Sequence, residues 1–390
     1  MIPMKVAGLF AGIGGLELGL RQAGHNSVAF SEIWEPAAAV LASRFPDAPN
    51  LGDVSQIKSL PKGIELLTAG FPCQDLSQAG KTAGIKGSRS GLVEHVFRLL
   101  DGRKTPWVLL ENVSFMLHLD GGKAMSRLVR EFERRGYKWA YRVVNSLAFV
   151  PQRRERVFFL ASLEGDPADV LFADEAAQPS FETRLDTHAH GFYWTEGVRG
   201  LGWAPDAVPT LKNGSTVGIA SPPAIMLPDG LIVKPDIRDA ERLQGFPIDW
   251  TQPAEGVRKA SWRWALVGNA VTVPVAEWVG RRLAEPGHHD PARDSRLASG
   301  ARWPRAAWFD GKTRALVQIS DFPVWRKRLP LTDFLQFEPV PLSIRATAGF
   351  LERTGRSSLR FAPGFRQRVA SHLDRMRALD ARASDLAAAE

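Results

Sequence analysis

The sequence is poor in cysteine, and its apolar stretches are short. Cys73 is the single cysteine among 390 residues, which excludes an internal disulfide and a thiolate metal site, and we predict no bound metal. No apolar run approaches the roughly 18 to 20 residues that span a bilayer. The amino terminus also lacks the charged, apolar and small-residue regions of an export signal. These absences predict a cytoplasmic protein with no membrane partner, stabilised by packing alone.

The composition that is present is typical of a globular protein. Hydrophobic residues make up 44% of the chain, aromatic residues 9% and charged residues 24%. The net charge is +8, and residues 286–390 hold 18 Lys and Arg against 11 Asp and Glu, so nearly all of the excess lies there. A basic surplus of this kind indicates an anionic partner, and nucleic acid is the natural candidate.

Hydrophobic periodicity divides the chain into segments. Within residues 1–163, short apolar runs alternate with amphipathic stretches, which is typical of repeated strand–helix units. Such units build a sheet covered on both faces, so the predicted fold class is α/β with a doubly wound, mostly parallel sheet. Residues 164–260 are rich in Gly, Pro and Thr and predict a smaller, loop-rich domain. Helical periodicity returns in residues 261–285, and a basic extension follows over 286–390.

A glycine-rich turn joins the first predicted strand to the first predicted helix. Gly12, Gly14 and Gly15 let main-chain N–H groups approach an anionic group, and the start of the helix adds a partial positive charge. A dinucleotide site would place a further glycine at position 17, where Glu17 would instead repel a pyrophosphate. A tight turn that binds nothing and a dehydrogenase-like site both stay open as alternatives.

A carboxylate follows at the end of the second predicted strand. Glu32 lies 20 residues after Gly12 and can accept hydrogen bonds from both hydroxyls of a ribose. Asp53 can accept a hydrogen bond from an adenine amino group. A small carboxylate for the glycine turn, a ribose for Glu32 and the absence of phosphates fit S-adenosylmethionine, which we predict as the cofactor.

Cys73 follows a later apolar run, at the carboxyl end of a predicted parallel strand, where open α/β sheets build their active sites. A lone cysteine is more often a small buried hydrophobe, but Pro72 before it and polar residues after it favour a nucleophile. Residues 79–91 are rich in Gly, Lys and Ser and predict a mobile basic loop. Glu111 ends the next strand at the same edge, and a helix-capping or surface glutamate is the alternative to a catalytic acid there.

Together these segments resemble the C5-cytosine DNA methyltransferase family, whose conserved blocks they match in order over residues 5–283. The blocks with Pro-Cys-Gln and Gln-Arg-Arg-Glu-Arg are the most diagnostic. The resemblance implies a Rossmann-like fold that uses S-adenosylmethionine, in a bacterial or phage enzyme that is solitary or part of a restriction–modification system. The matching blocks are Gly12–Gly15, Glu32, Gly52-Asp53, Pro72-Cys73-Gln74, Glu111-Asn112-Val113, Gln152–Arg156, Arg242–Pro247 and Gly268–Val271.

The resemblance also implies covalent chemistry on cytosine. Cys73 would attack C6 while Glu111 protonates or hydrogen-bonds N3. Of Arg154 and Arg156, one would meet the O2 side of the base and the other would support Glu111. Residues 261–285 would return to the first domain and complete the cofactor pocket. The implied cofactor-binding residues are Phe10, Gly12, Gly14, Gly15, Leu16, Glu32, Ile33, Asp53, Val54, Pro72, Asn269 and Val271.

The implied substrate is double-stranded DNA, from which the target base must be flipped out, with closure of the 79–91 loop as the gate. Residues 164–260 occupy the place of a target-recognition domain, in which residues 210–215 are either a base-reading loop or an ordinary surface turn. We expect a monomer, with a cognate restriction endonuclease as a possible partner. The predicted DNA-contacting residues are Gln74, Ser77, Lys81, Arg89, Thr210, Lys212 and Arg242, of which Arg242 also resembles a residue that braces the small domain.

Two residues depart from the family pattern. Gly8 stands where many members carry an acid at the end of the first strand, and Ile33 stands where a tryptophan is frequent. The adenine would then pack on an aliphatic face, with Phe10 and Trp34 nearby. The alternative functions are an RNA methyltransferase of the same superfamily and a non-catalytic DNA-binding relative.

The extension at 286–390 lies beyond the matching blocks. Its Trp303, Trp308 and Trp325, together with its arginines, could clamp DNA phosphates or dock another protein. A packed appendage with a basic outer face is the alternative.

Overall fold

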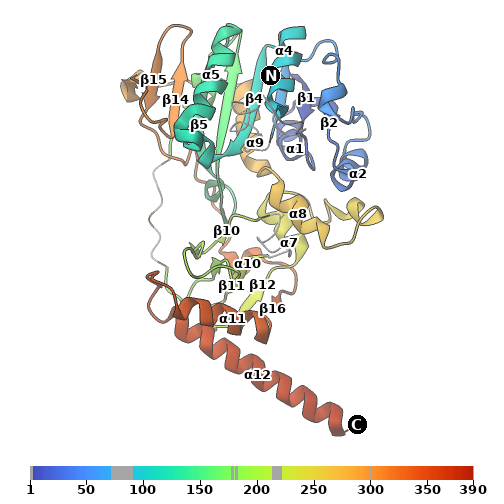
Figure 1. Ribbon diagram of the computed structural model, residues 1–390, viewed down its shortest axis with the longest axis vertical. Helices are drawn as coiled ribbons and strands as arrows, with labels where there is room; N and C mark the ends of the chain where they lie inside the picture. The colour runs from blue at the N-terminus through green and yellow to red at the C-terminus, as the bar shows by residue number, and fades with distance from the viewer. Residues whose placement is uncertain are drawn as a thin grey trace, which may run out of the picture.

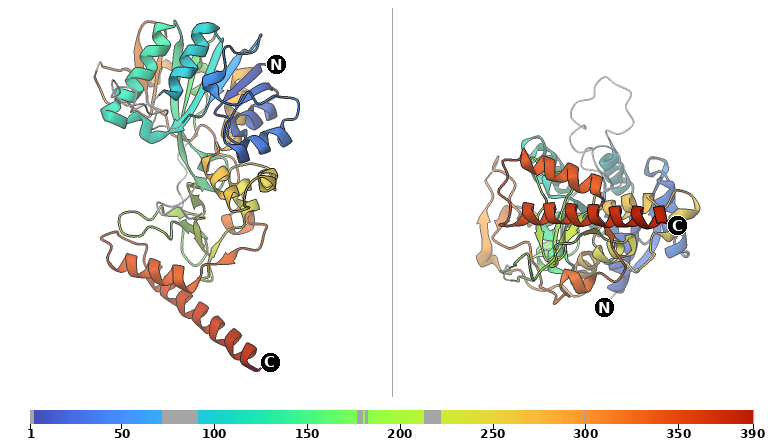
Figure 2. Two further views of the ribbon diagram at one scale, coloured as in Figure 1. Left: turned by 45° about the vertical axis from the view of Figure 1, so that its right-hand side comes forward. Right: turned by 90° about the horizontal axis from the view of Figure 1, so that it is seen from below.

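The computed structural model of the protein describes residues 3–71, 91–176, 180, 183–212, 222–298 and 300–389. The chain forms two lobes, each built on its own sheet (Figure 1). The amino terminus lies in the larger lobe, and helix α12 (Phe365–Ala389) carries the carboxyl terminus away from the smaller one (Figure 2). None of the described helices is long and apolar enough to cross a membrane.

The larger lobe contains a nine-stranded sheet in the order β13-β15-β14-β5-β7-β4-β3-β1-β2. Strands β1 to β4 are parallel, whereas β7 is antiparallel to both of its neighbours, β4 and β5. The central strands are apolar along almost their whole length because helices cover both faces, and this confirms the predicted α/β class. The strands from the first half of the chain are β1 (Lys5–Leu9), β2 (Asn26–Ser31), β3 (Leu66–Ala69), β4 (Trp107–Val113), β5 (Lys138–Asn145) and β7 (Glu155–Ser162).

Helices pack on the two faces of this sheet in separate groups. Side chains of α4 and α5 form one core with the strands, and side chains of α1, α6 and α9 form the core of the opposite face. Helix α9 comes from late in the chain yet lies against α1 of the larger lobe. The helices of this lobe are α1 (Gly15–Gln22), α2 (Glu35–Arg44), α4 (Leu92–Gly102), α5 (Lys123–Arg134), α6 (Pro167–Leu171) and α9 (Val273–Ala284).

The smaller lobe is built on a five-stranded antiparallel sheet in the order β16-β12-β11-β8-β9. A two-stranded parallel ladder between β6 (Gln152–Arg153) and β10 (Val208–Pro209) links it to the chain just before β7. The strands of the smaller sheet are short: β8 (His190–Phe192), β9 (Ala204–Pro205), β11 (Ala224–Met226), β12 (Ile232–Lys234) and β16 (Val340–Pro341). Its helices are α7 (Ile237–Leu243), α8 (Trp262–Asn269), α10 (Leu331–Phe334), α11 (Ile344–Gly355) and α12.

The basic extension is shared between the two lobes. Strand β14 (Ala306–Phe309) pairs with β5, and β15 (Arg314–Val317) and β13 (Asp294–Arg296) continue the larger sheet outward. Further along, β16 joins the smaller sheet, and α11 and α12 lie side by side beneath it (Figure 2). Trp303 is buried, and its indole N–H donates a hydrogen bond to the Gly122 carbonyl oxygen at 3.1 Å. This tryptophan therefore packs against the larger lobe.

Candidate functional site

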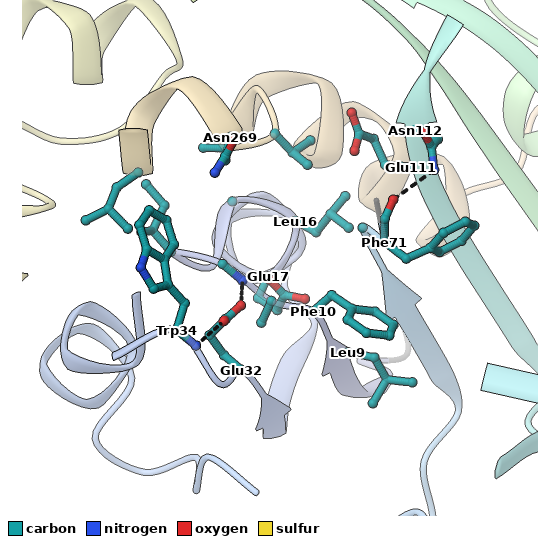
Figure 3. Close-up of a pocket in the computed structure, with 18 of the residues that line it drawn as sticks. Leu9, Phe10, Leu16, Glu17, Glu32, Trp34, Phe71, Glu111, Asn112 and Asn269 are labelled. Carbon is teal, nitrogen blue, oxygen red and sulfur yellow. Dashed lines mark hydrogen bonds between the residues drawn. The ribbon is translucent and has the colours of Figure 1, made fainter. Parts of the chain in front are cut away.

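A cavity of about 580 Å³ opens at the carboxyl ends of strands β1 to β4. The turn after β1, the ends of β2, β3 and β4, and the α8–α9 connection supply its walls (Figure 3). This edge of an open α/β sheet is where ligands bind. The lining residues are Leu9–Ile13, Gly15–Glu17, Glu32–Trp34, Gly70, Phe71, Leu92, Glu111–Val113, Arg154, Arg156, Leu266 and Gly268–Val271.

The glycines of the turn after β1 serve different purposes. Gly14 has a φ of +79°, and a Cβ there would lie 2.6 Å from the ring of Phe45, so this glycine allows close packing outside the cavity wall. A Cβ on Gly15 would lie 2.7 Å from the main-chain oxygen of Val271, which lets the α8–α9 connection close against helix α1. Gly12 faces open space, and its N–H donates a hydrogen bond to Glu32.

Glu32 is held by main-chain donors at the end of β2. Its Oε2 accepts from Gly12 N–H at 2.8 Å and its Oε1 accepts from Trp34 N–H at 2.7 Å. Burial raises the pKa of Glu32, and these hydrogen bonds oppose the rise. Each carboxylate oxygen can accept more than one hydrogen bond, so both retain acceptor capacity for a ligand.

Glu111 projects from the end of β4 into the opposite part of the cavity. Arg156 Nε lies 3.0 Å from Glu111 Oε1, and the pair is largely buried. Burial raises the pKa of Glu111, while the nearby Arg156 and Arg154 oppose the rise. The neighbouring Asn112 donates its side-chain N–H to the Phe71 carbonyl at 2.9 Å, which fixes the end of β4 to the end of β3.

Arg154 connects three segments behind the cavity. Its guanidinium donates to the carbonyls of Leu211 at 3.2 Å, Gly268 at 3.4 Å and Ala270 at 2.8 Å. Arg154 therefore joins the smaller lobe and the α8–α9 segment to the chain between β6 and β7. Its role in the described contacts is to hold these segments together.

Three buried polar atoms of the cavity wall have no hydrogen-bond partner among the described residues. They are Oε2 of Glu17, Nε of Arg154 and Oε1 of Glu111, the last of which has the Arg156 guanidinium 3.0 Å away. A buried polar atom that stays unpaired costs about 1 to 3 kcal/mol, so the cavity is suited to a polar ligand.

Several predicted cofactor residues do line the cavity, but three do not. Phe10, Gly12, Gly15, Leu16 and Glu32 are in the wall, as are Ile33, Asn269 and Val271. Gly14, Asp53 and Val54 are outside it. The Asp53 carboxylate accepts from Ser55 N–H at 2.8 Å, which lowers its pKa, and Val54 is buried in the core beside α4.

The predicted DNA-contacting residues of the smaller lobe make contacts within the protein. Arg242 Nη1 donates to Asp239 at 2.7 Å and to the Phe334 carbonyl, which fits a bracing role. Lys212 is paired with Glu196 and stands 3.6 Å from the centre of the Tyr193 ring. The Thr210 hydroxyl donates to the Arg153 carbonyl at 2.9 Å.

The remaining predicted residues lie outside the part of the chain that the structure describes. They include the predicted nucleophile, and the predicted loop at 79–91 falls there except for its last residue. Their assignments stay predictions. These residues are Pro72, Cys73, Gln74, Ser77, Lys81 and Arg89.

The cavity also contains residues that the sequence analysis did not assign to the site. Glu17 is the most notable of them. From the sequence we infer only that Glu17 would repel a pyrophosphate, whereas in the structure its carboxyl group lies in the cavity wall. The signal that could have found it is the missing acid at Gly8. Other wall residues without a predicted role are apolar and belong to none of the matching blocks, among them Leu9, Phe71, Leu92 and Leu266.

The chain is similar to known proteins in sequence and in fold. Residues 4–192 match the family model described as C-5 cytosine-specific DNA methylase. The chain is 46% identical over 367 residues to the Type II methyltransferase M2.BsuMI of Bacillus subtilis (strain 168), covering 90% of this chain and 94% of that protein. It is 29% identical over 304 residues to the Type II methyltransferase M.NgoBI of Neisseria gonorrhoeae, covering 70% and 90%. The solved structure of the S. pombe Dnmt2 methyltransferase aligns with a TM-score of 0.53 at 18% identity, covering 72% and 98%, and is similar in fold.

Proposed function

The chain belongs to the family of C-5 cytosine-specific DNA methylases, and on that premise we propose that it methylates C5 of a cytosine flipped out of a specific double-stranded DNA sequence. The long match to a Type II methyltransferase supports a role in restriction–modification. The observation that carries the proposal is the cavity itself, which brings Glu32 and Glu111 to one sheet edge. A cognate restriction endonuclease is the expected functional partner, and the enzyme acts as a monomer.

Cys73 is the proposed nucleophile, because C5 of cytosine is too weakly nucleophilic to be methylated directly. Addition of the Cys73 thiolate to C6 forms a carbon–sulfur bond and moves electron density to C5. After methylation, a base removes the C5 proton, and elimination breaks the carbon–sulfur bond and releases the thiolate. Phe71, two residues before Cys73, is tied to the end of β4 next to Glu111, and this supports a shared site.

Glu111 is the proposed partner of the cytosine N3. Burial raises the pKa of Glu111, so a proton can be kept there for the base during thiolate addition. Arg156 limits that rise and orients the carboxyl group through their 3.0 Å contact. Arg154 acts as a positioning residue because its guanidinium is bound to carbonyl groups of the surrounding segments.

S-adenosylmethionine is the proposed cofactor, and when bound it supplies an electrophilic methyl group. The wall residues fit it: the cavity volume lies within the usual roughly 300 to 1,000 Å³ of small-molecule sites, and unpaired buried polar atoms are present. Glu32 would accept hydrogen bonds from the ribose hydroxyls, and Gly12 and Gly15 would allow close approach of the main chain. Phe10, Leu16, Ile33, Asn269 and Val271 would complete the pocket.

We further propose that the chain divides into residues 1–163 for catalysis, 164–260 for target recognition, 261–285 returning to the first unit, and 286–390 as the extension. DNA would lie between the lobes, contacted from the small-domain side by Thr210, Lys212 and its neighbours. Residues 79–91 would close over the flipped base.

Methyl incorporation into DNA tests this proposal. Plasmid DNA from cells that express the protein should contain 5-methylcytosine at one recurrent sequence, read by bisulfite sequencing. The Cys73→Ser variant should leave the DNA unmethylated while still binding duplex DNA. Unmethylated DNA from cells that contain the folded wild-type protein would refute the proposed function, and methylation by Cys73→Ser would refute the role of the cysteine.

A further inference from the structure

A carboxyl group from helix α1 fills the space beside the end of β1. Gly8 lies near the end of this strand, and a Cβ built on it would be 2.4 Å from Glu17 Oε1 and 3.0 Å from Glu17 Cδ. A side chain at position 8 and the observed Glu17 conformation therefore exclude each other. Glu17 places an acid where the sequence pattern of the first strand lacks one.

Glu17 is buried in the wall of the cavity and is only partly hydrogen-bonded. Its exposed fraction is 1%, and Oε1 accepts from the Thr68 hydroxyl at 2.7 Å. Oε2 has no hydrogen-bond partner within the described part of the chain. A fully buried acid with one unpaired oxygen in a ligand cavity is suited to a ligand that carries a donor or a positive charge.

The surroundings of Glu17 contain no cation that pairs with it among the described residues. Strand β2 carries no charged residue, and β1 carries only Lys5, at its opposite end. The charged residues of α9, the helix packed on α1, are paired elsewhere: Glu277 with Arg281 and Arg326, and Arg282 with Asp174. The other charged residues of the cavity wall are Glu32, Glu111, Arg154 and Arg156.

The position of Glu17 along the sheet edge indicates which part of a ligand it meets. The order β4-β3-β1-β2 places Glu111 at one side and Glu32 at the other, with Glu17 over β1 and beside Thr68 of β3 (Figure 3). If the ribose lies at Glu32 and the reacting base at Glu111, the methionine portion of the cofactor lies between them. That portion carries the α-ammonium group.

We propose that Glu17 is a cofactor-binding residue whose carboxylate pairs with the α-ammonium group of S-adenosylmethionine, in place of an acid on the first strand. This inference rests on the proposed function, because it requires that cofactor. Its physical basis is that the ammonium supplies both the missing donor and the missing positive charge for Oε2.

The protonation behaviour of Glu17 is consistent with this role. Burial raises its pKa to about 7, so part of the free protein carries a neutral Glu17 at neutral pH. Thr68 Oγ1 lies 2.7 Å from Glu17 Oε1 and 3.4 Å from the Ala7 carbonyl, so the hydroxyl can accommodate either protonation state. Binding a cation favours the carboxylate, so the proton should leave when the cofactor binds.

Isothermal titration calorimetry with three ligands tests the proposal. S-adenosylmethionine and S-adenosylhomocysteine both carry the ammonium, whereas 5′-methylthioadenosine lacks it. Glu17→Gln preserves the shape of the side chain and removes its charge. We expect this variant to bind the first two ligands with an affinity lower by about 10- to 100-fold, the range for a hydrogen bond between charged groups. Its affinity for 5′-methylthioadenosine should be unchanged. Proton release at pH 7, measured in buffers of different ionisation enthalpy, should also fall in the variant.

Other results would distinguish a wrong function from a wrong role for Glu17. Wild-type protein that binds none of the three ligands would overturn the proposed function itself. Unchanged affinities in Glu17→Gln, or equal weakening of all three ligands, would overturn the role of Glu17 while the function stands. Weakening of S-adenosylmethionine alone would assign the carboxylate to the sulfonium and refute the ammonium contact.

A rescue experiment distinguishes the loss of a ligand contact from a defect in packing. Gly8→Asp in the wild-type background should impair binding of S-adenosylhomocysteine, because its side chain collides with Glu17. Glu17→Ala vacates that space, and the double variant Gly8→Asp/Glu17→Ala should recover at least half of the affinity lost by Glu17→Ala, in logarithmic terms. A double variant no tighter than Glu17→Ala would contradict the proposal that an acid at this place binds the ligand.

Discussion

Three carboxyl groups line the cavity, and each meets a different environment. Main-chain N–H groups hold Glu32, Arg156 pairs with Glu111, and Glu17 accepts a hydrogen bond from the Thr68 hydroxyl. Burial raises the pKa of all three. Their different partners suit them to different tasks: a fixed acceptor, a proton-holding acid and a site for a cation.

Glu111→Gln tests the proton-holding role. Glutamine can hydrogen-bond the base but cannot protonate it, so we expect the single-turnover methylation rate to fall by about 10²- to 10⁴-fold while duplex DNA still binds. Because the pKa of Glu111 is raised, the wild-type rate should decline as pH rises through that pKa, and the residual rate of Glu111→Gln should lack this decline. A near-wild-type rate in the variant would rule out proton transfer by Glu111.

Glu17→Gln should change the pH dependence of stability in the protein without cofactor. The pKa of Glu17 is about 7 in the folded chain against an ordinary value of 4.5 for a glutamate, so folding favours the protonated form. Wild-type stability should therefore fall as pH rises from about 4.5 and level off above about 7, losing about 3 kcal/mol from this group. Urea unfolding at pH 5 and pH 8 should show the variant gaining relative to wild type at pH 8. Equal differences at both pH values would contradict the burial of an unpaired acid.

The sequence predicts some of these residues and misses others for physical reasons. Glu32 and Glu111 are predictable because they end strands, and the carboxyl ends of parallel strands share one edge. Asp53 is predicted to accept a hydrogen bond from the ligand, and its carboxylate also caps the short helix Val54–Gln56, so its contact with a ligand stays a prediction. Glu17 is missed because its meeting with Gly8 depends on the packing of helix α1 on β1.

The elements around the site depend on close contacts between segments far apart in the sequence. Helix α9 packs on α1, and the α8–α9 connection touches the glycine turn through Gly15 and Val271. The cavity is therefore closed by a segment more than 250 residues from the turn. Its shape depends on small residues at these contacts.

Gly15→Ala should open this contact. A methyl group there would lie 2.7 Å from the Val271 main-chain oxygen, which must move. We expect a loss of stability of about 1 to 3 kcal/mol, the usual range for overpacking, and at least tenfold weaker binding of S-adenosylhomocysteine. Gly102→Ala is the matched control, since nothing lies within 4 Å of its added methyl group. Equal affinities in the two variants would show that the α8–α9 connection does not shape the pocket.

Periodicity predicts the first half of the larger sheet but not its far edge. The buried strands β1, β3 and β4 are apolar runs between amphipathic helices, so the pattern identifies them. Strands β13, β14 and β15 have three or four residues each and lie in the extension, outside the strand–helix alternation of the first half of the chain. Their position is set by pairing of β14 with β5, a long-range contact that local sequence does not encode.

Across the whole molecule, the basic extension is built into both lobes. It lengthens the larger sheet beyond β5, and Phe350, Phe365 and Val369 pack under the smaller sheet. The extension therefore supports the position of the lobes that would enclose DNA. Its basic residues can contribute to DNA affinity only as part of this framework.

Truncation tests that integration. Deleting residues 286–390 exposes the edge of β5 and the apolar underside of the smaller sheet, so we expect aggregation or loss of cooperative thermal unfolding. Deleting only residues 377–390 removes the end of α12, in which residues 377–385 are exposed, and should leave the unfolding temperature nearly unchanged. If the chain that lacks residues 286–390 folds and binds S-adenosylhomocysteine, the extension is an independent appendage.

Covalent trapping on a fluorinated substrate can show whether Cys73 adds to the cytosine ring. A duplex with 5-fluorocytosine at the methylated position, incubated with S-adenosylmethionine, blocks loss of the C5 substituent and so prevents release of Cys73. We expect a denaturation-resistant complex of one protein and one duplex, with peptide mass spectrometry locating the bond at Cys73. Cys73→Ser should form no such complex. A covalent complex formed by that variant, or none formed by a wild-type protein that methylates the unmodified duplex, would contradict the proposed role of Cys73.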